Sequence, residues 1–189
     1  MSVSLAKGQR ISLSKDSDGL KKVVVGLGWN PVKQGFFGIK PQIDCDASAL
    51  YCKNGQYAGV VYYGDRSALN KAIYHHGDNL TGSGRGDDEQ ITVDLTALPS
   101  EVDKIVFFVN IYQASQRKQD FGLIDGAFIR LVNAENHTEI CKYNLSEKYD
   151  GKTAMILGEI YKKGTEWKFN AIGTGTTDNS ISEVIGRYR

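Results

Sequence analysis

The sequence has almost no net charge and no long apolar run. Its 23 Lys and Arg residues nearly balance 22 Asp and Glu residues, so the net charge is +1. That balance provides no long-range field to attract nucleic acid or an anionic membrane. No window approaches the roughly 20 apolar residues that span a bilayer, and the opening MSVSLAKGQR lacks the apolar core of a signal peptide. We therefore expect a cytoplasmic protein with no membrane span and no nucleic-acid partner.

Cysteine is scarce as well. Cys45, Cys52 and Cys141 are odd in number and have no CxxC spacing, which argues against a disulfide framework or a zinc site and fits a reducing cytosol. We expect three buried thiols that pack as small apolar side chains. Redox or oxyanion chemistry at Cys45, which lies between two aspartates, is an alternative.

Familiar catalytic motifs are also missing. No HExxH or related spacing surrounds His75, His76 or His137, and no GxSxG turn presents a nucleophile. We expect each histidine to face solvent or to be hydrogen-bonded. The sequence therefore predicts a protein that is not an enzyme.

The apolar residues that are present indicate β-structure. Most apolar segments alternate with a period of two and are rich in Val, Ile, Tyr and Phe. KKVVVGLGW (21–29) and KIVFFVNIY (104–112) are instead continuous apolar runs. Runs of this kind are typical of strands buried on both faces, so these two are predicted to be central strands.

Three hairpins are predicted. Asn54-Gly55 can supply the two positive φ angles of a type I′ turn between apolar arms. A second turn is expected at Lys163-Gly164, and a third pairing over 127–143 needs a longer polar loop. After the second turn we expect Trp167, Phe169 and Ala171 to point inward.

Helix is predicted only in short segments, namely SALNKAI (67–73), SQRKQDF (115–121) and SISEVIGRYR (180–189). About ten strands and few helices favour an all-β fold, a two-sheet antiparallel β-sandwich with a few short helices. The chain is predicted to be a single domain over 1–189, with a loose glycine- and threonine-rich segment near 173–179.

Two acidic groups stand out, and the first is IDCDASALY (43–51). If this segment is a strand, Asp44 and Asp46 leave the same face about 6 to 7 Å apart at their Cα atoms. Two carboxylates about 5 Å apart repel by roughly 3 kcal/mol at an effective dielectric near 20. A positively charged partner is therefore expected beside them.

The second group is the segment GDNLTGSGRGDDE (77–89). It carries four acids, Asp78, Asp87, Asp88 and Glu89, against a single Arg85. The glycines at 82, 84 and 86 let backbone carbonyls turn inward. Carboxylate and carbonyl oxygens together are the ligand set of a hard cation, and flexible geometry with many oxygens favours calcium.

The segment is not an EF-hand, because Leu80 and Gly82 occupy positions where that loop needs oxygen-bearing side chains. A calcium site here would have to be completed by another strand, for which Asp44 and Asp46 are the obvious donors. One alternative is a solvated surface loop. Another is a divalent-metal-dependent hydrolase that uses the same acidic cluster.

Seven motifs in order make the chain resemble the TerD family of tellurium-resistance and general-stress proteins over nearly its whole length. They are SVSLAKGQRISLSK, GLGW, IDCDASA, GDNLTG, GDDEQI, KIVFFVNIY and AFIRLV. The resemblance implies a compact β-sandwich that binds calcium at one acidic edge and takes part in stress response or tellurite resistance. No enzymatic activity is established for the domain of that family, so the resemblance implies none for this chain.

The resemblance assigns the metal site residue by residue. The implied ligand positions are Asp44, Asp46, Asp78, Asn79, Gly82, Gly84, Gly86, Asp87, Asp88 and Glu89. Similar members commonly carry acids where this chain has Ser83 and Arg85, and often Asp where it has Asn30, so one or two calcium ions are expected and the second is in doubt. The expected role is a calcium-dependent interaction or signalling module, with other proteins of the same resistance system as candidate partners.

Overall fold

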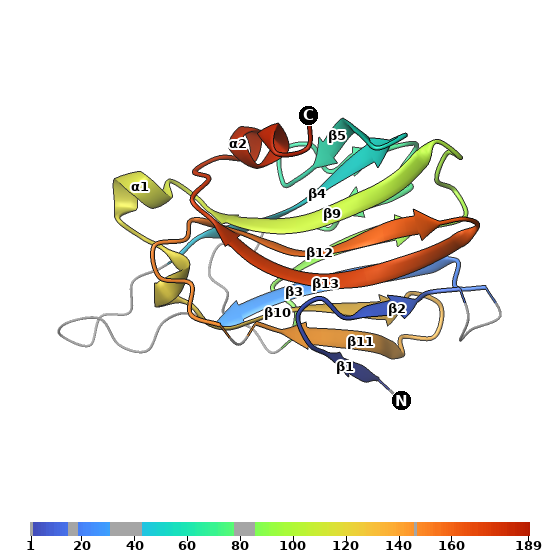
Figure 1. Cartoon of the computed structure of the whole chain (residues 1–189), viewed down its shortest axis with the longest axis horizontal. Coiled ribbons are helices and arrows are strands. Elements are labelled where there is room, and N and C mark those ends of the chain that lie inside the picture. The colour runs from blue at the N-terminus through green and yellow to red at the C-terminus, as the bar shows by residue number, and fades with distance from the viewer. Residues whose placement is uncertain (1, 15–18, 31–42, 78–85, 146) are drawn as a thin grey trace.

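The protein is a sandwich of two β-sheets that pack face to face (Figure 1). The computed structural model describes residues 2–14, 19–30, 43–77, 86–145 and 147–189. The first sheet has the order β1 (Val3–Leu5), β11 (Glu139–Asn144), β10 (Asp125–Asn133), β3 (Lys22–Asn30), β8 (Glu89–Asp94), β7 (Ile73–His75) and β6 (Ser67–Ala68). The second has the order β2 (Arg10–Ser12), β13 (Glu166–Thr176), β12 (Ala154–Lys163), β9 (Val102–Ile111), β4 (Cys45–Lys53) and β5 (Gln56–Val61).

The predicted fold class is confirmed. Among the described strands only β1 and β11 pair in parallel, and the other neighbours are antiparallel. The described helical segments are short: α1 (Ala114–Arg117), the 3₁₀ turn η2 (Phe121–Leu123) and α2 (Ile181–Gly186). The architecture is therefore an all-β sandwich with a few helical turns outside the two sheets.

The two continuous apolar runs are central strands, as predicted. β3 lies between β10 and β8, and β9 lies between β12 and β4. Ile105 and Phe107 of β9 face the core between the sheets, whereas Val106 and Phe108 belong to a second cluster with Val184 of α2. Helix α2 covers the outer face of the second sheet, so both faces of β9 are buried. This explains why the apolar run in β9 is continuous and does not alternate with polar residues.

All three predicted hairpins form, the third as the antiparallel β10–β11 pair with the connection 134–138. Asn54 and Gly55 have φ angles of 51° and 79°, both positive as a type I′ turn requires. In the β12–β13 hairpin Lys163 pairs with Glu166, so the turn lies one residue later than predicted, at Gly164 and Thr165. Trp167, Phe169 and Ala171 all belong to the core between the sheets, as expected.

One helix prediction is wrong. Segment 67–73 contains β6, then Leu69, Asn70 and Lys71 with φ angles of 52°, 55° and 66°, then the start of β7. Three successive left-handed residues cannot continue a right-handed helix, so the segment is a tight connection between two short strands. The other two predictions are both met in part, by α1 within 115–121 and by α2 within 180–189.

The predicted loose segment near 173–179 is ordered over much of its length, which corrects that expectation. Thr174, Gly175 and Thr176 pair with residues 154–156 of β12. Asp178 follows the strand, is 9% exposed, and binds Arg187 at the end of α2 through two hydrogen bonds of 2.6 and 3.1 Å. These contacts fasten α2 to the outer face of the second sheet.

We predict that Asp178→Asn weakens this attachment. Burial alone would raise the pKa of Asp178, but hydrogen bonds from Arg187 and Thr176 outweigh it and lower that pKa. The ionised form therefore stabilises the fold above the unfolded-state pKa near 4, and this contribution is lost as the pH falls through the lower folded-state pKa. Urea unfolding should give a loss of about 1 kcal/mol at pH 7 that shrinks in acid. A loss independent of pH would contradict the assignment.

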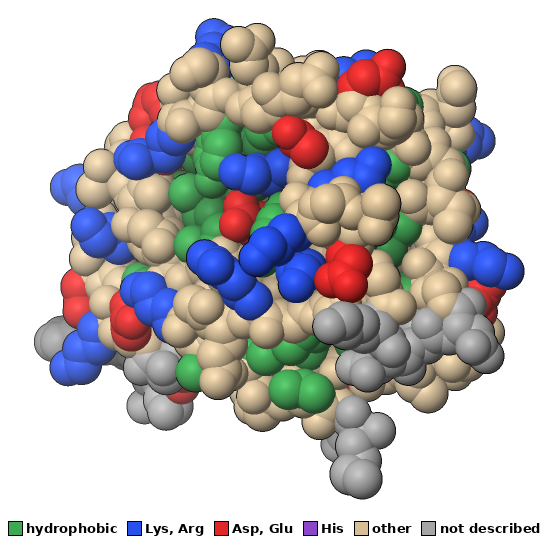
Figure 2. Space-filling model, turned by 45° about the vertical axis from the view of Figure 1, so that its right-hand side comes forward, with side chains coloured by type: hydrophobic (Ala, Val, Ile, Leu, Met, Phe, Trp, Pro, Cys, Tyr) green, Lys and Arg blue, Asp and Glu red, His purple; other side chains and the backbone are tan. Residues whose placement is uncertain are grey.

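Charged side chains of both signs are mixed on the face shown in Figure 2, where Lys and Arg side chains gather near the centre with Asp and Glu side chains among them. Within the described ranges, no helix is long and apolar enough to cross a bilayer. All three cysteines are buried free thiols, which confirms their predicted packing role.

Candidate functional site

The candidate site is built on the first residues of β4, which among the described strands pair with β9 alone. β9 pairs with β4 from Cys45 onward, but β5 pairs with it only from Ala49. On the other side, Oε2 of Glu89 in β8 accepts a hydrogen bond of 2.8 Å from the backbone N–H of Ala47. A carboxylate of the opposite sheet thus accepts the hydrogen bond that a neighbouring strand would accept. It links the acidic run, which we define as residues 87–89, to the Asp-Cys-Asp segment at 44–46.

His75 completes the same contact. Its Nε2 lies 3.1 Å from the carbonyl oxygen of Ala47 and 3.2 Å from Oε2 of Glu89, and its Nδ1 accepts a hydrogen bond from Gly77 N–H at 3.1 Å. A backbone N–H can only donate, so this network assigns the proton to Nε2 and makes the ring neutral. His75 is 0% exposed and Glu89 is 2% exposed. His75 is hydrogen-bonded, one of the two outcomes expected from the sequence.

Asp88 fastens the acidic run to the end of β3. Its Oδ2 accepts a hydrogen bond of 2.7 Å from Trp29 N–H, and its own N–H donates to the Leu27 carbonyl at 2.8 Å. Burial raises the pKa of Asp88, the Trp29 N–H lowers it, and the charge of Asp87 raises it, with a net increase. Trp29 is 5% exposed and packs in the core between the sheets.

Asp87 has a different partner from its neighbours. Its two oxygens bind Nε and Nη2 of Arg130 in β10 at 2.6 and 3.1 Å, and Oδ2 also accepts from Gln90 Nε2 at 2.9 Å. The side chain of Asp87 is 1% exposed and lies over Gly26 of β3. This bidentate ion pair fixes Asp87, the first residue of the acidic run, against the outer face of the first sheet.

The Cys45 thiol lies within electrostatic range of four carboxylates. Burial raises the pKa of its thiol well above the usual value, and the charges of Asp46, Asp44, Glu89 and Asp88 raise it further. The Cys45 side chain points into the core, while Asp46, the next residue, lies on the outer face of the sheet. The expected alternation along this strand is therefore present, although Asp44 precedes the first paired residue.

The structure brings together the C-terminal half of the predicted site and the β4 residues. Gly86 has a φ of 117°, a conformation that favours glycine, and leads into the acids of β8. The predicted positions Asp78, Asn79, Gly82 and Gly84, and the departures Ser83 and Arg85, lie outside the described residues. Within the described part of the chain, no group of three or more His, Cys, Asp and Glu side chains is arranged to hold a metal ion.

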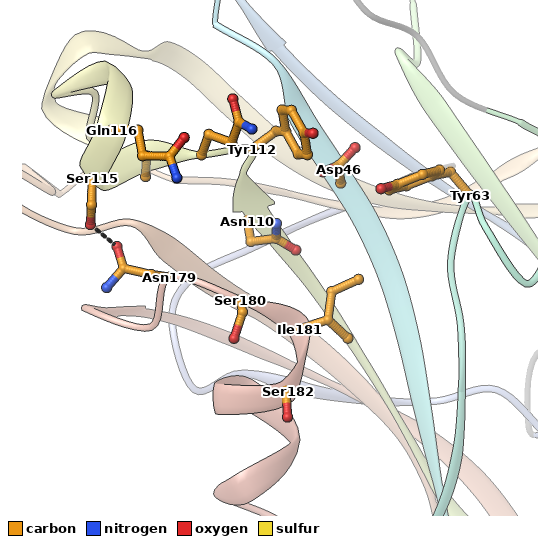
Figure 3. A pocket seen from close by; sticks show the side chains of 12 residues that line it. Asp46, Tyr63, Asn110, Tyr112, Ser115, Gln116, Asn179, Ser180, Ile181 and Ser182 are labelled. Atoms are coloured by element: carbon orange, nitrogen blue, oxygen red, sulfur yellow. Dashed lines mark hydrogen bonds between the residues drawn. The ribbon is translucent and has the colours of Figure 1, made fainter.

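The sequence analysis missed two residues of this region. Arg130, in AFIRLV, is the partner of Asp87, and its signal was a cation within an apolar strand. Asn110, in KIVFFVNIY, is 5% exposed and opposite Asp46 in the β4–β9 register, and its signal was a single amide in an apolar run. Asp46 and Asn110 line a cleft of about 410 Å³ between β4, α1 and the start of α2 (Figure 3).

Known proteins are similar in sequence to this chain along its whole length. The TerD domain matches residues 1–188. The chain is 50% identical to the stress response protein SCP2 of Bacillus subtilis (strain 168), with 100% of both chains covered. It is 46% identical to the tellurium resistance protein TerD of Serratia marcescens, with 100% of this chain and 97% of that protein covered.

A solved structure shares the fold. The homologue of telluride resistance protein (TerD) from Streptomyces coelicolor A3(2) superposes with a TM-score of 0.67 over 87% of this chain and 95% of that chain, at 20% identity. The full-length domain match and the identities of 46–50% confirm the family resemblance read from the sequence. The chain belongs to the TerD family of tellurium-resistance and stress-response proteins.

Proposed function

We propose that this domain binds calcium between the start of β4 and the acidic run that opens β8, and that it acts without catalysis as a calcium-dependent interaction module in stress response or tellurite resistance. The observation that carries the proposal is the 2.8 Å hydrogen bond between Glu89 and Ala47. It joins the two acidic segments, which come from opposite sheets and are far apart in the sequence.

The chemistry of the donors fits calcium. Asp44, Asp46, Asp88 and Glu89 offer only carboxylate oxygens, the ligands that hard cations prefer, and all four lie close enough to Cys45 to affect its pKa. Asp87 fits less well as a ligand, because both its oxygens are bound to Arg130. We assign Asp87 to positioning the segment. Asp78, Asn79 and the carbonyls at 82, 84 and 86 would complete the proposed set.

Gathering these carboxylates is unfavourable without a cation. Each pair of charges about 5 Å apart costs roughly 3 kcal/mol at an effective dielectric near 20. A bound calcium ion would turn that repulsion into shared coordination and would join the two sheets at the start of β4. Loading would therefore change the charge and rigidity of one end of the sandwich, which is the kind of signal a partner protein can recognise.

We expect calcium to raise the melting temperature of the chelator-treated protein. An ion that binds only the folded state stabilises it by about 2.7 kcal/mol at a hundredfold excess over the dissociation constant. Differential scanning calorimetry in EGTA and then in excess calcium measures this shift. The double variant Asp46→Asn with Asp88→Asn should abolish it.

The matched control is Glu166→Gln, which removes a carboxylate from the distant β12–β13 hairpin. This variant should keep the full calcium shift, since the Glu166 carboxylate forms its ion pair with the half-buried Lys168 at 3.5 Å, away from the proposed site. Absence of any shift in the unmodified protein would refute the proposal. An undiminished shift in the double variant would refute the location of the site.

A further inference from the structure

The second sheet has two edge strands, β5 and β2, and they differ in what covers them. At β5, Tyr57 N–H donates a hydrogen bond of 3.3 Å to the carbonyl of Tyr188, which follows α2. Within the described ranges, β2 pairs with β13 on one side and with no strand on the other. An edge strand of this kind is a template on which a second extended chain can pair.

The hydrogen bonds of β2 show which of its backbone groups are available. Leu13 N–H donates to β13 at 2.9 Å, and the Gln9 carbonyl accepts from β13 at 3.0 Å. Backbone groups of successive residues point to opposite sides of an antiparallel strand, so Ile11 also faces β13. The N–H and C=O groups of Arg10 and Ser12 therefore point away from the sheet. In the described part of the chain these four groups have no hydrogen-bond partner.

On its core-facing side, β2 lines a cavity of about 380 Å³, which is within the size range of ligand sites. Half of its lining is apolar, namely Val3, Ile11, Leu13, Leu20 and Ile140. Val3 is 46% exposed, more than any other large hydrophobic side chain of the described residues. Glu139 is the charged residue of the lining, and Arg130 binds it at 3.2 Å. The cavity therefore suits an apolar side chain.

The outer face of β2 is basic. Ile11 packs toward the core, so Arg10 and Ser12 point to the outer face of the second sheet. Arg10 is exposed and forms no ion pair with any described residue. Lys168 of β13 lies opposite Ser12 and is paired only with Glu166, at 3.5 Å. Acidic side chains on a neighbouring strand would complement these two cations.

We propose that the free edge of β2 binds an extended acidic segment of a partner protein by strand addition. Its backbone pairs with the N–H and C=O groups of Arg10 and Ser12. Its residues opposite these two are acidic, and the residue between them is apolar and enters the cavity beside Ile11, because side chains alternate along a strand. The inference goes beyond the proposed calcium function and does not depend on it.

The test titrates the capped peptide Ac-Glu-Val-Glu-Val-Glu-NH2 into the full chain in excess EGTA, so that the result is independent of calcium. The readout is amide hydrogen exchange, resolved by residue in ¹H–¹⁵N spectra. We expect the peptide to slow exchange saturably at Arg10 and Ser12, and least at Ile11, which already donates to β13. Absence of saturable slowing at Arg10 and Ser12 would overturn the proposal.

Two further peptides test the backbone and the charge separately. The same peptide with every backbone nitrogen methylated has no N–H donors and should not bind. Ac-Lys-Val-Lys-Val-Lys-NH2 keeps the donors and the apolar residues but reverses the charge, so it should bind more weakly than the acidic peptide, with the difference shrinking at high salt. Equal binding of the acidic and methylated peptides would refute strand addition, and equal binding of the acidic and basic peptides would refute the charge preference.

Variants of β2 test the same contacts from the side of the protein. Ser12→Pro removes an N–H that does not bond to β13, and it should weaken binding about three- to tenfold, the contribution of one backbone hydrogen bond. Ser12→Ala keeps the N–H and is the matched control. Equal affinities of the two variants would contradict the proposed pairing. Should the proline variant unfold, the methylated peptide still decides the question.

Arg10→Gln should weaken binding of the acidic peptide about two- to fivefold, the effect of one exposed ion pair, and Arg10→Lys should restore most of it. Lys71→Gln, in the connection between β6 and β7 of the other sheet, is the control and should bind normally. Sedimentation velocity without peptide tests a second copy of this chain as the occupant. Self-association that protects the Arg10 and Ser12 amides and is lost on dilution would overturn the proposal of a separate acidic partner.

Discussion

Glu89→Ala is expected to cost about 3 kcal/mol of the free energy of unfolding, even in the absence of calcium. The substitution leaves the buried Ala47 N–H without its acceptor and removes one of the two acceptors of His75 Nε2–H, which keeps the Ala47 carbonyl at 3.1 Å. Each buried donor that loses its partner costs about 1–3 kcal/mol, and Glu89 is 2% exposed, so water does not replace it readily. Urea unfolding in EGTA measures the loss.

Glu89→Gln separates the structural role of this residue from the proposed metal role. Its amide oxygen can still accept from Ala47, so we expect a loss of only about 1 kcal/mol. Because the charge is gone, calcium should no longer raise the melting temperature by the full amount. Equal losses for the Ala and Gln variants in EGTA would show that the hydrogen bonds do not stabilise the start of β4.

Gly26→Ala is the second change with a large expected effect. A Cβ at this position would overlap the carboxylate of Asp87, which is held in place by Arg130 and Gln90 and is 1% exposed. Either β3 shifts or the Asp87–Arg130 pair breaks, and overpacking of this kind costs about 1–3 kcal/mol. We therefore expect a loss of about 3 kcal/mol once the displaced ion pair is included, measured by urea unfolding.

A double-mutant cycle tests this mechanism. In an Asp87→Ala background the obstacle is removed, so Gly26→Ala should cost less than about 1 kcal/mol. Gly186→Ala is the matched control, because no atom lies within 4 Å of its Cβ position and it ends helix α2. It should be neutral or slightly stabilising. Additive losses in the cycle would contradict the role assigned to Asp87.

The strands could be predicted because their signals are local. Period-two patterns and the Asn54-Gly55 turn depend on near neighbours in the sequence, and both are present as expected. The failure at 67–73 has a physical cause: the segment has helix-forming residues, but its short strands pair with β7 and β8, and three left-handed residues make the connection. Tertiary pairing overrode the weak propensity of seven residues.

The acidic residues of the candidate site could be predicted from the sequence, but the residues that they contact could not. Asp46 stands out by the Asp-x-Asp spacing with Asp44, and Asp88 and Glu89 stand out because carboxylates cluster with glycines in 77–89. That Glu89 would reach the start of β4 depends on how the two sheets face each other, which no local pattern encodes. The same holds for Arg130, which reaches Asp87 from 43 residues away.

The departures at Ser83 and Arg85 bear on how many ions the domain holds. They remove two acids and add a cation to the segment that supplies part of the proposed ligand set. Lower charge weakens calcium sites, so the family resemblance and the sequence make different predictions for the second ion. We therefore expect the number of bound ions, more than the presence of binding, to test the effect of these departures.

Isothermal titration of the chelator-treated protein with calcium tests the central claim most directly. We predict saturable binding of one ion per chain, eliminated by Asp46→Asn with Asp88→Asn and retained by Glu166→Gln. Two tight ions would show that backbone carbonyls compensate for Ser83 and Arg85. Titration without saturable heat, confirmed by an unchanged melting temperature, would contradict the claim that these carboxylates form a calcium site.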